Sequence, residues 1–398
     1  MRIIKKITKR FLQFLLLIFI VANLFIILSG RFYLYKGVLN TYFKGRSGPS
    51  IYDKDIFANS TIKKANDIYK WNISAKKVVL NKYEEKVALE QETSSLLIIK
   101  NDTIIFEKYW GDHNQNTVSN SFSATKTFIS LLVGIAIEEG KIKSLDEPVS
   151  TYLKSFKEKG KDKITVRHLL MMASGLDWEE SGKNPLSENA ESYYGTDLWG
   201  LVNRQKAISK PGINFNYQSG NSQLLGYIIE KATKQDLSKY AYEKIWSQIG
   251  TEHDAFWSLD KENSDEKAFC CLYGTSRDFA RLGRLILNNG KWNGKQIVSE
   301  KYMQEMFANP EMKTEENIPN YRYGLHIWTY LGEKNPVYYC RGILGQYIIS
   351  IPAENLVIVR TGMKRMKNIE TSENKFKIGH PADLFLYIST AKRMAKIK

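Results

Sequence analysis

The stretch from Ser121 to Gly140, SFSATKTFISLLVGIAIEEG, is a nearly unbroken apolar helix pattern with small hydroxyl residues and one lysine at its front. A helix that is apolar on every side must be enclosed by the rest of a domain, so this segment predicts a large hydrophobic core. Lys126 follows Ser123 by three positions, and residues at that spacing share one face of a helix. The lysine must therefore either extend its ammonium to solvent or be held inside for a chemical reason.

The front of such a helix can support nucleophilic chemistry. Its first backbone N–H groups are unpaired and lie at the positive end of the helix dipole, where they can hold an oxyanion. Burial lowers the pKa of a lysine, and a neutral amine can accept the proton of a neighbouring hydroxyl. The alternative is a serine N-cap beside a lysine that reaches solvent. The Ser-x-x-Lys spacing recurs elsewhere in this lysine-rich chain, but only Ser123 opens a long apolar helix.

A second apolar run lies near the N-terminus. Residues 11–28, FLQFLLLIFIVANLFIIL, contain only Gln13 and Asn23 as polar side chains, and the run is long enough to cross a bilayer as a helix. The alternative is a signal peptide that is cleaved to leave a secreted protein, although no small-x-small cleavage site is evident near Ser29 and Gly30. We therefore favour an uncleaved membrane anchor.

The charges around this run predict its orientation. Five basic residues and no acid precede it, whereas Arg31 and Lys36 follow it. The positive-inside rule then predicts a single pass through the cytoplasmic membrane, with the folded domain extracytoplasmic. The predicted organisation is a cytoplasmic basic tail at 1–10, a transmembrane anchor at 11–29, a membrane-proximal spacer at 30–85 and a folded domain at 86–398.

The composition narrows the classes of partner and cofactor. The net charge of +16 favours anionic surroundings such as a membrane face, but no helix with clustered arginines is present, so nucleic acid is not an expected partner. The five histidines lack ligand spacing such as HxxxH, so we expect neither a metal nor another cofactor. The three cysteines form no CxxC, and a bridge between the adjacent Cys270 and Cys271 would be strained, so a disulfide framework is not expected.

The remaining patterns predict the fold class. Two β-branched runs flank Asn101 and Asp102 and indicate a hairpin. Helical periodicity dominates the middle of the chain, strand patterns return between Tyr323 and Gly362, and a final helix begins near Pro381. We therefore predict an α+β domain in which strands distant in sequence join one antiparallel sheet, covered by the first and last helices of the domain.

Two further motifs follow the Ser-x-x-Lys motif. Tyr217 stands just before another helix pattern, and Gly342, Gly345 and Gln346 form a Gly-x-x-Gly-Gln turn before a strand. In this order the three motifs resemble those of the serine β-lactamase and penicillin-binding protein superfamily, and most closely its class C branch, which includes 6-aminohexanoate-dimer hydrolase and family VIII esterases. The resemblance implies a β-lactamase/transpeptidase-like fold, with an antiparallel sheet flanked by helices and a mostly helical subdomain.

The resemblance also implies a role for each motif. Ser123 is the expected nucleophile that accepts the acyl group, and Lys126 is expected to hold or remove its proton. Tyr217 is expected to shuttle a proton to the leaving group, for which the Lys126 cation would have to depress the pKa of the phenol. The backbone N–H groups of Ser123 and Ile343 are expected to form the oxyanion hole.

Two departures from the family pattern bear on the substrate. Ser219 stands where β-lactamases usually carry asparagine, and Cys340-Arg341-Gly342 replaces Lys-Thr-Gly. Strand alternation directs Cys340 and Gly342 to the site and Arg341 away from it, so the cation that anchors a β-lactam or peptide carboxylate is expected to be missing. This favours a serine hydrolase that cleaves an amide or ester bond of a small or peptide-like substrate. The alternatives are a D-alanyl-D-alanine carboxypeptidase or weak β-lactamase, and a non-catalytic penicillin-binding-like envelope protein.

Aromatic residues are frequent between the first and second motifs. In the superfamily that this chain resembles, the corresponding segment lines the substrate cleft. Trp178, Tyr193, Tyr194 and Trp199 are therefore candidates for stacking on the substrate, with packing in the core as the alternative.

Overall fold

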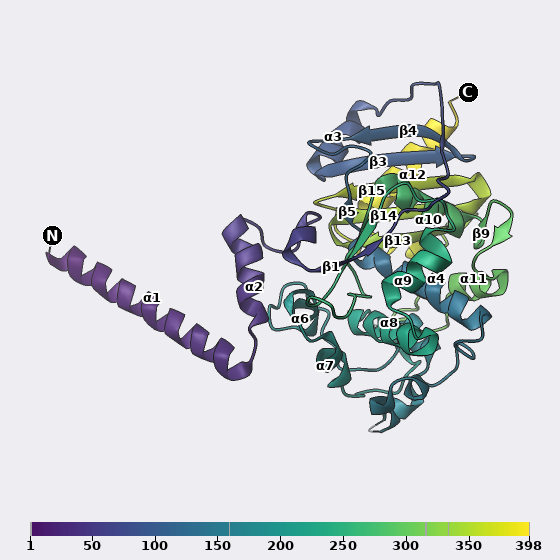
Figure 1. Cartoon of the computed structure of the whole chain (residues 1–398). Helices are drawn as coiled ribbons and strands as arrows, with labels where there is room; N and C mark the ends of the chain where they lie inside the picture. The colour runs from purple at the N-terminus through teal and green to yellow at the C-terminus, as the bar shows by residue number, and fades with distance from the viewer. Residues whose placement is uncertain (1, 159, 315–316, 333, 398) are drawn as a thin grey trace.

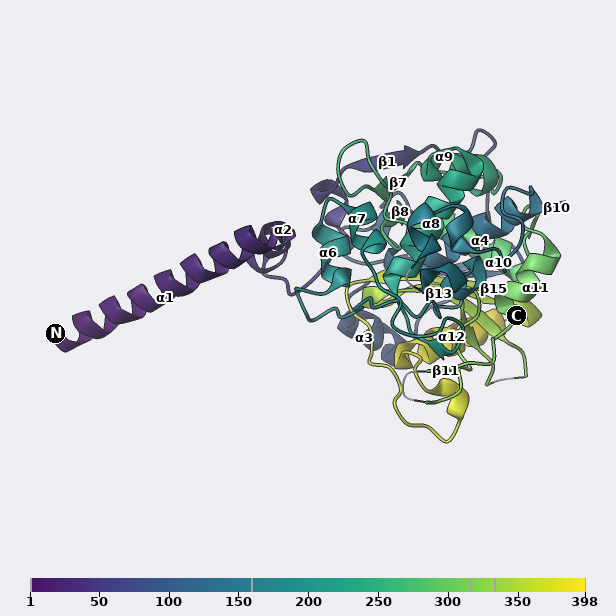
Figure 2. The same cartoon turned by 90° about the horizontal axis from the view of Figure 1, so that it is seen from below.

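A long N-terminal helix projects from a body that is built of one large sheet and a group of helices (Figures 1 and 2). The structure is a computed structural model and describes residues 2–158, 160–314, 317–332 and 334–397. Met1, the first residue of the predicted tail, and Lys398, the last residue of the predicted domain, lie outside the described residues.

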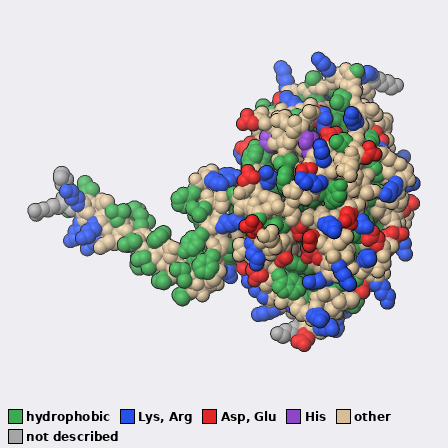
Figure 3. All heavy atoms as spheres, viewed as in Figure 1, with side chains coloured by type: hydrophobic (Ala, Val, Ile, Leu, Met, Phe, Trp, Pro, Cys, Tyr) green, Lys and Arg blue, Asp and Glu red, His purple; other side chains and the backbone are tan. Residues whose placement is uncertain are grey.

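The projecting helix is α1 (Arg2–Ser29), and it includes the whole predicted anchor. Figure 3 shows hydrophobic side chains along its length and Lys and Arg side chains at its free end. None of its apolar window is buried against the body. Its length and composition are those of a membrane span or of a signal sequence.

The large sheet confirms that strands from both ends of the domain pair with one another. Its order is β12-β13-β14-β15-β3-β4-β2, so the strand β3 lies beside β15 although the two are far apart in sequence. All neighbours are antiparallel except β2 and β4. The strands are β2 (Asn72–Ile73), β3 (Thr93–Lys100), β4 (Thr103–Tyr109), β12 (Trp328–Tyr330), β13 (Val337–Gly342), β14 (Gln346–Ile351) and β15 (Leu356–Gly362).

The predicted hairpin joins β3 to β4. Asn101 and Asp102 form the turn with φ of 50° and 58°, the left-handed conformation that a two-residue hairpin loop requires. Asp102 also accepts hydrogen bonds from the Arg284 guanidinium at 2.5 and 2.7 Å, which ties the turn to a helix on one face of the sheet.

Helices cover both faces of the sheet. Helix α10 (Ser276–Leu287) packs on Val357 of β15, whereas α12 (Ala382–Ala395) contacts Arg360 of the same strand, and residues an odd number apart in a strand point to opposite faces. Helix α3 (Lys82–Glu90) joins α12 through an ion pair between Arg393 and Glu84 at 2.6 Å. The last helix thus covers the sheet as predicted, but α10 rather than the first helix covers the other face.

The first helix of the predicted domain pattern, α4 (Thr125–Glu138), has a different position because it is apolar on all sides. It packs between α8 and the strand β13, and residues 125–136 are all buried. The helical subdomain around it confirms the predicted fold class. Its other helices are α5 (Val166–Leu170), α6 (Glu188–Tyr194), α7 (Leu198–Asn203), α8 (Ser219–Thr233), α9 (Leu237–Ala241) and α11 (Glu300–Phe307).

The predicted spacer at 30–85 is built into the body in this structure. Helix α2 (Tyr33–Asn40) packs on α6, and strand β1 (Asn59–Ile62) pairs with β7 (Ala255–Ser258). That pairing belongs to a second sheet of order β1-β7-β8-β5. The remaining strands are β5 (Ser119–Asn120), β6 (Asn214–Phe215), β8 (Leu272–Gly274), β9 (Lys291–Trp292), β10 (Lys295–Gln296) and β11 (Lys313–Thr314).

Close packing of α10 on the sheet gives a test of the fold. A Cβ added at Gly283 would lie 2.6 Å from Val357 Cγ1 and 3.0 Å from Ile348 Cγ2. We expect Gly283→Val to lower the free energy of unfolding by about 1–3 kcal/mol, because overpacking forces neighbouring side chains out of their rotamers. Urea denaturation followed by tryptophan fluorescence measures this. Gly182→Val is the control, since a Cβ there meets nothing within 4 Å; equal midpoints for the two variants would contradict the packing.

Candidate active site

Ser123 lies in a short 3-10 turn (Phe122–Ala124) between β5 and α4. Phe122 has a φ of 46°, a left-handed conformation that is strained for an aromatic residue. Its backbone N–H donates a hydrogen bond to Asn120 Oδ1 at 2.8 Å and its ring is buried, so the surrounding structure maintains the strained turn. The turn leaves the Ser123 side chain partly exposed at the N-terminal end of α4.

Lys126 does not reach solvent. Its side chain is 1% exposed, and its Nζ donates to Ser123 Oγ at 3.1 Å, Ser219 Oγ at 3.0 Å and the Phe269 carbonyl at 2.8 Å. An ammonium has three N–H donors, and each has an acceptor here. Burial lowers the pKa of Lys126 to about 8, although the negative charge of Glu180 partly offsets this. About one lysine in ten is then neutral at pH 7.

Tyr217 lies next to Lys126. Lys126 Nζ lies 5.2 Å from the centroid of the Tyr217 ring, which packs edge-on to Tyr323 and stacks on Trp328. Burial and then the charge of Glu180 raise the pKa of the phenol above its usual value, and they outweigh the hydrogen bond with Ser123 that lowers it. The expected depression of this pKa is therefore absent, and Tyr217 keeps its proton at neutral pH.

Glu180 belongs to the same group, although its sequence context did not single it out. Its carboxylate accepts hydrogen bonds from Ser219 Oγ at 2.6 Å, Ser219 N at 2.7 Å and Trp178 Nε1 at 2.8 Å. Helix α8 begins at Ser219, so the carboxylate lies at the positive end of a helix dipole. The sequence offers Glu179 and Glu180 side by side, and only the fold directs the second one inward.

The third motif holds the backbone around Ile343 in place. Gly342 leaves no room for a Cβ against the Ser121 carbonyl, and Gly345 has a φ of 84°. The Gln346 amide binds the backbone of Gly362 at both ends and also donates to the Ile343 carbonyl at 3.2 Å. Ile343 and Ser123 line the same cavity, so the geometry is compatible with the expected oxyanion hole.

The residues before Gly342 take opposite sides of β13. Cys340 is fully buried, and burial raises the pKa of its thiol to about 12, so it is a neutral core residue. The Arg341 guanidinium lies 3.3 Å from the centroid of the Trp328 ring, which in turn stacks on Tyr217. Neither Cys340 nor Arg341 is among the described residues that line the cavity, and the charge of Arg341 is near enough to lower the pKa of Tyr217 in part.

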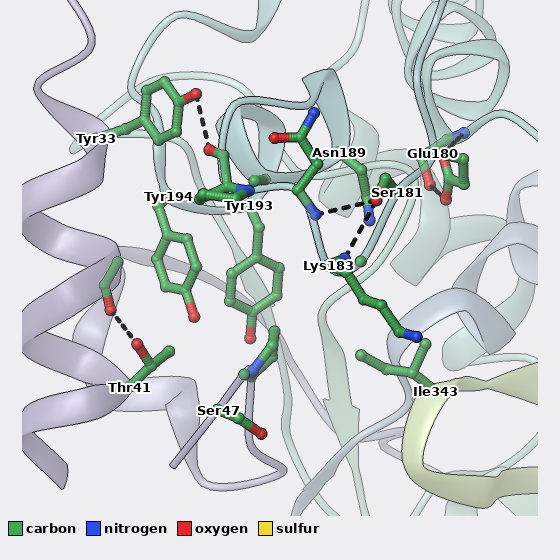
Figure 4. Close-up of a pocket in the computed structure, with 18 of the residues that line it drawn as sticks. Tyr33, Thr41, Ser47, Glu180, Ser181, Lys183, Asn189, Tyr193, Tyr194 and Ile343 are labelled. Carbon is green, nitrogen blue, oxygen red and sulfur yellow. Dashed lines mark hydrogen bonds between the residues drawn. The ribbon is translucent and has the colours of Figure 1, made fainter. Parts of the chain in front are cut away.

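Ser123 opens into a cavity of about 240 Å³ (Figure 4). Tyr193 and Tyr194 line it although both are largely buried, and the Tyr193 hydroxyl donates to Asp53 Oδ2 at 3.0 Å. Trp178 and Trp199 are not among the described residues that line the cavity. Trp178 is buried against Gly220, and Trp199 packs edge-on to Tyr227, so neither confirms its expected place at the substrate.

The adjacent cysteines differ from expectation, because Cys270 and Cys271 are joined by a disulfide. Cys271 has a φ of 69°, a conformation that the sequence alone does not reveal. The bridge follows Phe269, whose carbonyl binds Lys126, and Cys270 lines the cavity. The disulfide therefore lies in the loop that holds the buried ammonium.

The chain is similar to known proteins in both sequence and fold. The chain matches the model of the family described as Beta-lactamase over residues 85–368. It is 24% identical to 6-aminohexanoate-dimer hydrolase of Paenarthrobacter ureafaciens over 67% of this chain and 72% of that protein. It is 27% identical to a putative D-alanyl-D-alanine carboxypeptidase of Salmonella newport over 53% and 54%. A putative 6-aminohexanoate-dimer hydrolase from Bacillus anthracis shares the fold, with a TM-score of 0.71, 21% identity, and 87% and 92% coverage.

The pKa of Lys126 predicts how the reactivity of Ser123 depends on pH. Only the neutral amine can accept the Ser123 proton, so the rate of labelling by a fluorophosphonate should rise about tenfold per pH unit below pH 8 and level off above it. Lys126→Arg should lose at least about 100-fold in rate, since a guanidinium stays charged. A wild-type rate that stays constant from pH 6 to 9 would contradict this role.

Glu180 gives a second prediction, on the position of that profile. Its charge raises the pKa of Lys126, so Glu180→Gln should lower that pKa and move the rise in labelling rate to lower pH. Glu179→Gln is the matched control, because the Glu179 carboxylate binds the exposed Asn184 amide instead of Ser219. An unshifted profile in Glu180→Gln would exclude electrostatic tuning by this carboxylate.

Proposed function

Since this chain belongs to the Beta-lactamase family, we propose that it is a membrane-anchored serine hydrolase that cleaves an amide or ester bond through an acyl-enzyme on Ser123. The observation that carries the proposal is the buried Lys126, whose Nζ bridges Ser123 Oγ and Ser219 Oγ. Burial of an ammonium costs free energy, and such groups are common at functional sites. A lysine with a lowered pKa next to a serine hydroxyl has the property of a general base. The relatives named as hydrolases support the same class of reaction.

Acylation follows from the positions of these groups. Neutral Lys126 accepts the proton of Ser123 while Oγ attacks the substrate carbonyl carbon. The backbone N–H groups of Ser123 and Ile343, at the end of the cavity, stabilise the oxyanion. The Tyr217 phenol, which keeps its proton, donates to the leaving group as the bond breaks, and the protonated Lys126 restores that proton.

Deacylation uses the same groups in the reverse direction. A water molecule attacks the acyl carbon while the neutral amine of Lys126 accepts the proton of the water. Ser123 Oγ then leaves and receives that proton from Lys126. No organic cofactor or metal takes part in this scheme. Because Cys340 is neutral and buried, no cation at this position anchors a substrate carboxylate, which favours neutral amides and esters over β-lactams and D-alanyl peptides.

The anchor is the second part of the proposal. Helix α1 has the length and composition of a membrane span, and five basic residues precede its apolar run. By the positive-inside rule the helix crosses the cytoplasmic membrane once and leaves the hydrolase domain extracytoplasmic.

Two substitutions test the mechanism together. Ser123→Ala should abolish the mass increase that a fluorophosphonate adds to the intact chain. Tyr217→Phe should keep that labelling within about tenfold, because fluoride leaves without a proton, but should lower the turnover of an anilide substrate by about 100-fold or more. Intact-protein mass spectrometry and anilide hydrolysis measure the two effects. Labelling of Ser123→Ala equal to wild type would exclude the acyl-enzyme.

A further inference from the structure

One wall of the cavity is formed by the segment that directly follows the apolar helix α1. Leu34 and Val38 of α2, then Thr41, Tyr42 and residues 47–49, line it, opposite the loop that leads into α6 (Figure 4). Ser123 and Ile343 also line this cavity, and Figure 4 shows Ile343 on the side away from α2. Ser123 and the segment that follows α1 therefore share one cavity.

Hydrogen bonds fix the end of α1 against this cavity. Arg31 donates to the Leu186 carbonyl at 2.9 Å, and the Tyr33 hydroxyl donates to the Pro185 carbonyl at 3.1 Å. On the other side of the junction the Tyr35 hydroxyl donates to Asn23 Oδ1 of α1 at 2.6 Å. The junction is thus tied both to the apolar helix and to the loop that lines the cavity. Figure 1 shows α2 between α1 and α6.

The outer surface at this point is apolar and aromatic. Phe32, Tyr42 and Phe43 are 58%, 71% and 78% exposed, and the exposed Lys44 follows Phe43. Lys36 instead turns inward, with its Nζ 4.4 Å from the centroid of the Phe57 ring. Exposed aromatic side chains next to a lysine are typical of segments that lie in the headgroup region of a bilayer. With α1 in the membrane, this surface meets the bilayer and brings the cavity to its interface.

The cavity has both apolar and polar walls. Leu34, Val38, Tyr193 and Tyr194 supply apolar surface, and the polar lining residues are Thr41, Ser47, Glu180, Lys183, Asn184, Asn189 and Ser219. Figure 4 shows Lys183 beside Ile343. Tyr217 is not among the described residues that line it. Because the Tyr217 phenol serves the leaving group, the cavity lies on the acyl side of the bond to be cleaved.

From these observations we propose that the substrate is a membrane amphiphile with an aliphatic acyl chain, which enters the cavity between α2 and the loop before α6. This inference rests on the proposed function. The carbonyl of the ester or amide meets Ser123, whose Oγ forms the new bond to the acyl carbon while the bond to the headgroup alcohol or amine breaks. The headgroup leaves with the proton donated by Tyr217, and water then releases the fatty acid.

The test uses the full chain in phosphatidylglycerol nanodiscs with p-nitrophenyl acetate and p-nitrophenyl dodecanoate. We expect kcat/KM for the dodecanoate to exceed that for the acetate by at least about tenfold, because ten additional CH₂ groups are available for burial. Val38→Asp places a charge in the cavity wall and should lower this ratio by at least about tenfold. Leu39→Asp is the matched control, since Leu39 follows Val38 on the same helix and is exposed like it (57% against 41%), but does not line the cavity, and it should keep the wild-type ratio.

The outcomes separate this inference from the proposed function. If Ser123 is labelled and the acetate is hydrolysed but the dodecanoate has no advantage, the acyl-chain site is excluded and the serine hydrolase remains. If Val38→Asp and Leu39→Asp lower the ratio of kcat/KM for dodecanoate to that for acetate equally, the acyl-chain site in the cavity is also excluded. The preference for the dodecanoate then comes from the membrane surface. If neither labelling nor acetate hydrolysis depends on Ser123, the proposed function is excluded, and this inference with it.

Discussion

The burial of the Lys126 ammonium is the constraint on which the rest of the site depends. A charge in a core is tolerated only where each of its donors is satisfied, and here the acceptors come from Ser123, Ser219 and the Phe269 carbonyl. These three residues belong to segments far apart in sequence, so the lysine links α4, the start of α8 and the loop that holds the disulfide. The same burial that lowers the pKa of Lys126 therefore also fixes the nucleophile against the helical subdomain.

The charge of Glu180 affects the pKa values of both Lys126 and Tyr217. Without a nearby negative charge, burial would lower the pKa of Lys126 further, and a weaker base would drive acylation less well. The carboxylate is itself held by two bonds to Ser219 and one to Trp178, so its position depends on the start of α8. The charge of Glu180 also raises the pKa of Tyr217, which keeps that phenol protonated as a donor. One carboxylate thus sets the proton balance of both partners of the nucleophile.

The residues that follow α1 are held firmly against the rest of the domain. Because α2 packs on α6 and β1 pairs with β7, the residues after α1 are part of the domain and not a loose tether. Such a segment cannot change its position relative to Ser123 without loss of these contacts. In the membrane-anchored form that we propose, this attachment fixes the distance between the bilayer and Ser123, which is the physical basis of the proposed membrane substrate.

The sequence by itself determined the elements that follow from local patterns: the apolar helix behind Ser123, the hairpin at Asn101, the sheet strands and the order of three motifs. It also determined that Lys126 and Ser123 share a helix face, because the α-helical repeat requires it. Only the tertiary structure decided the electrostatics. The inward turn of Glu180 and the raised pKa of Tyr217 depend on neighbours brought from distant segments, because burial and charge act through space and not along the chain.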